Sequence, residues 1–169
     1  MTTETNTNNA HTFSFLVANK PGVLVRIAQV FGRRAYNIDS LVVSPAMDGR
    51  YSRMTITAMG APEVIDQIVK QASKLIDVLH VTEHLGEHVI QKELALIKVE
   101  VNANIRTDLL QLVGHFKAQT VDFTEESMII QVTGDTDKLN AMIDMLSKYG
   151  ILEIVRTGKL VMARGREAT

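Results

Sequence analysis

The chain contains the same order of strand and helix patterns twice, once in each half of its 169 residues. In each half, alternating apolar and polar residues predict a strand, and apolar residues three and four positions apart then predict a helix. Two more strands, a second helix and a last strand follow. In the first half we expect strands at 12–17, 38–44, 52–58 and 78–82 and helices at 23–34 and 61–76. In the second half we expect strands at 95–101, 121–123, 128–132, 151–156 and 160–164 and helices at 109–116 and 136–149.

This repeat predicts an α+β protein made of two ferredoxin-like βαββαβ domains. Right-handed crossovers place both helices of such a unit on one face of a mainly antiparallel sheet. The polar residues between the halves predict a linker, and the polar start of the chain predicts a disordered tail. The expected boundaries are a tail at 1–10, a first domain at 11–84, a linker at 85–92 and a second domain at 93–169.

Several predicted strands carry apolar residues on both faces, so the sheets have more apolar surface than their own helices cover. A soluble protein normally buries such a surplus against another surface. We therefore expect a homodimer, in which two sheets join edge to edge or helices cover the exposed face.

The composition excludes several classes of protein. Hydrophobic residues make up 46% of the chain and charged residues 22%, as in ordinary soluble domains. A net charge of -1 argues against a nucleic-acid-binding face, which needs a surplus of basic residues. The chain has no cysteine, no apolar run near the roughly 20 residues of a membrane span, and no signal-peptide pattern. We expect a cytoplasmic protein that binds neither nucleic acid nor membranes.

The candidate binding site begins at the turn Asn19-Lys20-Pro21-Gly22, which leads directly into the first predicted helix. The free N–H groups and the dipole at a helix start favour an anion, and glycine permits a close backbone approach. Asn19 and Asn37 offer amide oxygens to an ammonium group, and Leu24 and Ile38 offer an apolar wall. These groups suit a small free amino acid. The alternative is that the segment forms only a turn and that Asn37 only ends a helix.

Other polar clusters have simpler interpretations. His80, His84 and His88 recur every four residues, but a strand is predicted at the first and a glycine interrupts the rest, so a solvated linker is favoured over a metal site. Helix capping explains Asp135 and Asp137. No nucleophile with a base, phosphate loop or metal cage is recognisable. We therefore expect no catalytic activity from the chain alone and no metal or cofactor of its own.

Four segments resemble one known family. The run from Asn19 to Leu41, Ser52–Ile56 and Lys74–Leu79 resemble the regulatory small subunits of acetolactate synthase, also called acetohydroxyacid synthase. Glu93–Val99 resembles the second domain of that family. The resemblance covers nearly the whole chain beyond the tail. It implies an N-terminal ACT domain, a C-terminal ferredoxin-like domain and a dimer in which two ACT sheets join.

The resemblance also implies a function. Members of this family bind and activate a separate large catalytic subunit, which uses thiamine diphosphate, magnesium and usually FAD. Valine is the usual feedback inhibitor, and the pathway is branched-chain amino-acid biosynthesis. The alternative function is a free-standing ACT-type amino-acid sensor that regulates a different enzyme.

In this family valine lies between two ACT domains, so the resemblance places the site on two subunits. This chain departs from the common pattern at Ala35, where many relatives have glycine. If this position requires a positive φ, Ala35 is strained. The expected valine site comprises Asn19, Gly22, Val23 and Leu24 of one subunit and Asn37 and Ile38 of the other.

Overall fold

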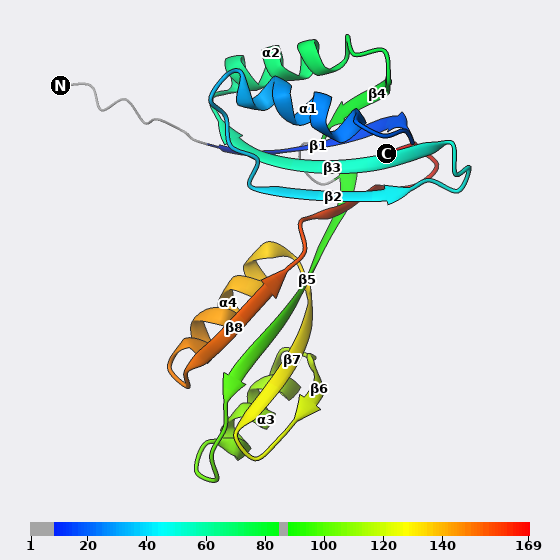
Figure 1. Ribbon diagram of the computed structural model, residues 1–169. Coiled ribbons are helices and arrows are strands. Elements are labelled where there is room, and N and C mark those ends of the chain that lie inside the picture. Colours follow the sequence, from blue (N-terminus) through cyan, green and yellow to red (C-terminus); the bar gives the residue numbers. More distant parts are fainter. Residues whose placement is uncertain (1–8, 85–87) are drawn as a thin grey trace, which may run out of the picture. The chain divides into compact units, whose positions relative to one another are not determined.

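The computed structural model describes residues 9–84 and 88–169, which form two compact units. The first unit takes in the chain up to Ile90 together with Gly158–Thr169, and the second is Gln91–Thr157. In each unit two helices cover one face of an antiparallel sheet (Figure 1). The predicted α+β class with two βαββαβ units is therefore confirmed.

The first unit contains four strands in the order β2-β3-β1-β4. Phe13, Phe15 and Val17 point from β1 into a core that α1 and α2 close, and all three are fully buried. Pro62 starts α2 as predicted, because a proline at the first helical position forfeits no intrahelical hydrogen bond. The elements are β1 (Asn9–Ala18), α1 (Val23–Gly32), β2 (Ser40–Pro45), β3 (Tyr51–Gly60), α2 (Pro62–Ala72) and β4 (Val78–Glu83).

The second unit repeats this arrangement, with strand order β6-β7-β5-β8. Its core lies between the sheet and α3 and α4, and Asp135 caps α4 by accepting a 2.9 Å hydrogen bond from the Lys138 N–H. This confirms the capping interpretation of Asp135. The elements are β5 (Val89–Glu100), α3 (Arg106–His115), β6 (Gln119–Phe123), β7 (Ser127–Gly134), α4 (Thr136–Ser147) and β8 (Ile151–Arg156).

The domain limits differ from the expected ones at three places. Residues 9–10 already belong to β1, and residues 89–92 begin β5, so part of the expected tail and linker is strand. Residues 1–8 and 85–87 of those segments lie outside the described residues. The segment Gly158–Thr169 groups with the first unit, where Gly158 packs against Ser40 and Val42 and the Arg164 N–H donates to the His88 carbonyl at 3.0 Å. Its strand β9 (Leu160–Ala163) pairs with β5.

The faces of the two sheets that lie opposite the helices are chemically different. In the first sheet this face carries small hydroxyl residues that are almost fully buried, together with the apolar Leu16, Val42 and Met59. In the second sheet, Leu96, Ile129 and Val155 line a shallow hollow of about 190 Å³, and Lys98 and Glu153 form an ion pair across it at 3.1 Å. Both sheets thus carry apolar residues on this face, as expected. The hydroxyl residues of the first are Thr12, Ser14, Thr55 and Thr57.

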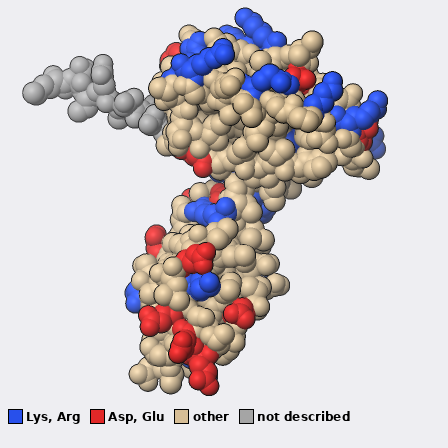
Figure 2. All heavy atoms as spheres, viewed as in Figure 1, with Lys and Arg blue, Asp and Glu red and all other residues tan. Residues whose placement is uncertain are grey.

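Charged side chains are unevenly distributed over the visible surface. In Figure 2, Lys and Arg side chains gather on the first unit, whereas Asp and Glu side chains gather on the lower end of the second. None of the helices in the described parts of the chain is both long and apolar enough to span a bilayer.

Candidate functional site

The predicted turn places Gly22 at the start of α1 in the left-handed conformation, with φ +81° and ψ -6°. A residue with a Cβ is strained in this conformation, which explains glycine here. Among the described residues, no side chain caps α1, and its first turn holds no acidic residue. The N–H groups of the first turn have no intrahelical acceptor, so this helix start can bind an anion.

Asn19 lies beside this helix start and is held by the β2–β3 connection. Its backbone N–H donates to the Arg50 carbonyl at 2.8 Å, and its Nδ2 donates to the Gly49 carbonyl at 2.9 Å. With the amide nitrogen engaged, Oδ1 is the atom of this side chain that can accept from an ammonium group.

The two residues after Gly22 differ in what they can offer a ligand. Val23 is 2% exposed and packs into the first core, so only its backbone is accessible. Leu24 is 38% exposed and remains available as an apolar contact. Of these two side chains, only Leu24 fits the predicted role.

Arg26 is a candidate site residue that the sequence analysis missed. A Cβ built on Gly22 would lie 3.2 Å from Arg26 Nη1, so the guanidinium lies over the turn. Its Nη2 pairs with Asp77 Oδ2 at 2.5 Å, and Asp77 also accepts the Ala18 N–H through its backbone carbonyl. Arg26 thus places guanidinium donors beside the helix start, while Asp77 balances their charge. Asp77 is 51 residues away in sequence, and no local pattern links the two.

The second predicted half-site follows the end of α1. Ala35 has φ +55°, and the N–H groups of Tyr36 and Ala35 donate to the carbonyls of Phe31 and Gly32. This is a Schellman ending, whose left-handed residue is usually glycine. The predicted strain at Ala35 is therefore confirmed. The ending directs the chain toward Asn37, which is exposed, and Ile38, which packs partly against the first core.

Within one chain the two half-sites are far apart. The turn at Asn19 follows Ala18, which pairs with Tyr51, whereas Ile38 precedes Ser40, which pairs with Thr57. Tyr51 and Thr57 are six positions apart along β3, which is about 20 Å in a strand. The structure thus brings Asn19, Gly22 and Leu24 together at one end of the sheet and leaves Asn37 and Ile38 at the other.

The strand β2 runs between these two ends and forms an edge of the sheet. Its side chains Leu41 and Val43 share the helix-covered face with Ile56 and Met54 and are 36% and 43% exposed. An exposed edge strand with apolar side chains is a site for pairing with another strand.

Of the three regularly spaced histidines, His84 is buried and His80 and His88 are exposed. Among the described residues, no group of three or more His, Cys, Asp or Glu side chains is placed to hold a metal ion. The solvated-linker interpretation is wrong for His84, which is 7% exposed and lies 2.7 Å from Ser14 Oγ through Nε2. Its backbone N–H donates to the Thr12 carbonyl, which extends the β1–β4 ladder. Burial, and to a lesser degree the charge of Arg53, lowers the pKa of His84 below its ordinary 6.5.

Comparison with known proteins identifies the class of this fold. Residues 13–80 match the family model of the AHAS small subunit-like ACT domain, and residues 92–165 match the model of the small subunit of acetolactate synthase. The first unit is thus an ACT domain, with the candidate site at its first helix start and edge strand.

Whole-chain relatives agree with these two models. The chain is 45% identical over 157 residues to a probable acetolactate synthase small subunit of Archaeoglobus fulgidus, covering 93% of this chain and 98% of that one. It is 41% identical over 155 residues to the acetolactate synthase small subunit of Mycobacterium bovis, covering 92% of each. The crystal structure of the small subunit from Thermotoga maritima matches with a TM-score of 0.85 at 38% identity, covering 94% of this chain and 99% of that one. The chain belongs to the family of acetolactate synthase small subunits, which are regulatory and non-catalytic.

Proposed function

We propose that this protein activates the large catalytic subunit of acetolactate synthase and makes the enzyme sensitive to valine. The observation that carries the proposal is the position of the two half-sites at opposite ends of the first sheet, beside the open strand β2. One copy of the chain offers half a site at each end. A second copy joined along β2 supplies both missing halves.

A two-fold axis at β2 accounts for this complementarity. Two copies of one edge strand related in this way run antiparallel, and residues opposite each other share a face of the sheet. The symmetric registers therefore centre on Val42 or on Val43. In either register Ile38 of one copy lies opposite residues 46–48 of the other, next to the turn that holds Asn19.

The chemistry of the joined halves suits valine. The uncapped start of α1 and the guanidinium of Arg26 attract the carboxylate, and the amide oxygens of Asn19 and Asn37 can accept from the ammonium group. Leu24 and Ile38 provide apolar contacts for an aliphatic side chain.

The partner implied by family membership is the large subunit, which would hold thiamine diphosphate, magnesium and FAD. No cofactor is proposed for this chain itself. The cytoplasmic location expected from the sequence stays a prediction.

Calorimetry on the purified chain tests the effector site. We expect valine to bind with a stoichiometry of about two per dimer, because two-fold symmetry creates two equivalent binding sites, one at each end of the β2 pair. Size-exclusion chromatography at the same concentration should show a dimer or a larger assembly. A chain that binds no aliphatic amino acid, or that is monomeric at micromolar concentration, contradicts the proposal.

Reconstitution with the large subunit from the same genome tests the regulatory function. The chain should raise the rate of acetolactate formation, and valine should reduce the raised rate. A pull-down from extract separates this function from that of a free-standing sensor, because only the regulatory subunit needs to capture a thiamine-dependent synthase.

A further inference from the structure

Three consecutive residues, Arg156, Thr157 and Gly158, lie where the chain leaves the second unit and returns to the first. Both units hold this short segment firmly. The contacts of Arg156 and Thr157 lie within the second unit, and those of Gly158 lie within the first.

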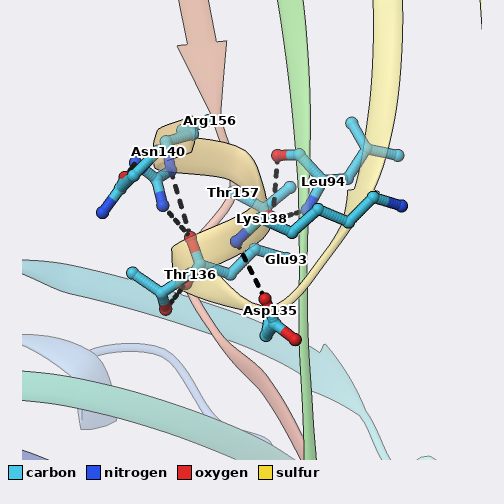
Figure 3. Close-up of polar contacts among 8 residues, drawn as sticks. All are labelled: Glu93, Leu94, Asp135, Thr136, Lys138, Asn140, Arg156 and Thr157. Carbon is cyan, nitrogen blue, oxygen red and sulfur yellow. Dashed lines mark hydrogen bonds and ion pairs between the residues drawn. The ribbon is translucent and has the colours of Figure 1, made fainter. Parts of the chain in front are cut away.

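In the second unit, Arg156 is held by a buried carboxylate. Its Nε and Nη2 donate to Glu93 Oε2 at 3.1 and 2.7 Å, and its Nη1 donates to Asn140 Oδ1 at 2.8 Å (Figure 3). Glu93 is 6% exposed and also accepts from the Thr136 hydroxyl, so both of its oxygens are engaged. A buried ion pair with this many hydrogen bonds fixes one geometry.

Thr157 is held to β5, the strand that contains Glu93, by hydrogen bonds of both its backbone and its side chain. Its N–H donates to the Leu94 carbonyl at 2.9 Å, and its Oγ1 accepts from the Leu94 N–H at 3.0 Å. The point where β5 enters the second unit and the point where the chain leaves it are therefore locked together. We call Glu93, Arg156, Asn140 and Thr157 the clasp.

In the first unit, Gly158 packs directly against β2. A Cβ built on it would lie 2.9 Å from Ser40 Oγ and 2.9 Å from Val42 Cγ2. Real Cβ atoms essentially never show such contacts, so a larger residue at this position forces the Ser40 and Val42 side chains, or β2 itself, to shift. Ser40 and Val42 belong to β2, where two copies of the chain are proposed to join and bind valine; we call this junction the valine seam. Ser40 is two residues beyond Ile38, a residue of the proposed valine site.

We propose that residues 156–158 couple the valine seam to the second unit. A displacement of β2 moves Gly158, and the clasp carries this displacement to β5. This inference rests on the proposed function. Close-packed contacts and satisfied polar networks transmit small shifts, because neither can absorb a displacement. When valine binds and draws the two β2 strands together, Ser40 and Val42 shift. Residues 156–158, held rigidly by their contacts, then move with them.

The coupling is measured as the ratio between the valine affinity of the chain alone and that of the chain bound to the large subunit. Linkage makes this ratio equal to the effect of valine on large-subunit binding. The probe is valine, titrated by calorimetry into the full-length chain and into the reconstituted complex.

Gly158→Ala tests the contact with β2, and Gly114→Ala is its matched control. Gly114 lies in α3, where a Cβ meets nothing within 4 Å. We expect Gly158→Ala to change the affinity ratio about five-fold or more in the direction of one, which means weaker coupling. Activation of the large subunit in the absence of valine should be retained. Gly114→Ala should leave the ratio unchanged. Adding Ser40→Gly to Gly158→Ala removes two of the three closest contacts and should restore part of the ratio.

Glu93→Gln tests the clasp without touching the first unit. The glutamine keeps the shape of the side chain but removes the charge that Arg156 pairs with. Its control is Glu153→Gln, which removes an exposed ion pair between the same two strands, β5 and β8. We expect Glu93→Gln to lower the ratio as Gly158→Ala does, and Glu153→Gln to leave it unchanged.

The outcomes separate this inference from the proposed function. If the unaltered chain neither binds valine nor confers valine sensitivity, the proposed function fails and this inference fails with it. If the unaltered chain does both and the folded Gly158→Ala and Glu93→Gln variants keep the full ratio, only the coupling segment is overturned. Thermal unfolding of each variant establishes that it is folded. If Gly158→Ala unfolds the first unit, the affinity ratio of Glu93→Gln alone tests the coupling.

Discussion

The same helix ending occurs in both units, each time at a residue that is not glycine. Ala35 and Lys117 have φ values of +55° and +50°, and each follows a helix with the paired hydrogen bonds of a Schellman ending. A left-handed conformation costs an L-residue roughly 1–2 kcal/mol, which glycine avoids at a smaller entropic cost.

We therefore expect Ala35→Gly to raise the free energy of unfolding by about 0.5–1 kcal/mol. Chemical denaturation followed by circular dichroism measures this change. Lys117→Gly should act in the same direction on the second unit. A loss of stability in both variants would show that the surrounding contacts have removed the strain.

Asn19 carries a sharper prediction about the ligand. We expect Asn19→Ala to weaken valine binding roughly 10–100-fold, because hydrogen bonds to charged groups contribute about 1.5–3 kcal/mol. Calorimetry measures the loss. Activation of the large subunit in the absence of valine should be unchanged, since the exposed Asn19 side chain bonds only the neighbouring turn. Equal loss of activation and binding would indicate that Asn19 is a structural residue.

His84 makes stability depend on pH. Its folded pKa is below its unfolded value, so the unfolded chain binds the proton more tightly. The stability gained from neutral His84 is present above about pH 6.5, the unfolded value, and is lost as the pH falls toward the folded pKa. We expect His84→Gln to reduce the drop in melting temperature between pH 7.5 and pH 5.5. His80→Gln, an exposed change on the preceding strand β4, should keep the drop of the unaltered chain.

Among the secondary-structure elements, β2 is the strand at which the proposed dimer forms. Val43→Lys places a charge on each side of the seam, close to the two-fold axis, where like charges repel. We expect the dimer to dissociate at least about tenfold more readily, with little effect on the fold, because Val43 is already 43% exposed. Analytical ultracentrifugation measures this. Val155→Lys on the outer strand β8, where the side chain is 56% exposed, is the matched control.

The elements themselves could be predicted from local spacing. The alternation at Phe13, Phe15 and Val17 and the proline at the start of α2 correctly placed β1 and that helix. The helix expected at 61–76 is shorter than predicted, because α2 ends at Ala72 and leaves Ile76 98% exposed.

The contacts that build the sites could not be predicted in this way. Arg26 meets Asp77 across 51 residues and Glu93 meets Arg156 across 63, and neither pair has a periodic signature. The separation of the half-sites within one chain likewise depends on strand register, which hydrophobic spacing alone does not determine. The family resemblance supplied the two-subunit site that local chemistry left open.

For the whole molecule, the return of Gly158–Thr169 to the first unit means that the two units are not independent segments. We expect a chain truncated after Thr157 to lose stability in the first unit while the second unit keeps its own, because the core of the second unit lies within residues 91–157. Hydrogen exchange of the two sheets separates these effects. Equal protection of β1 and β3 with and without residues 158–169 would contradict the expectation.

The same return has a consequence for synthesis on the ribosome. An ordinary tandem protein can finish its N-terminal domain while later residues are still being added. Here Gly158–Thr169 emerge only after the whole second unit has been made, so the first unit receives this last segment only at the end of synthesis. Until then Ser40 and Val42 lack their contact with Gly158. The nascent chain therefore completes the packing around β2, the strand of the proposed effector site, only after the second unit has been made.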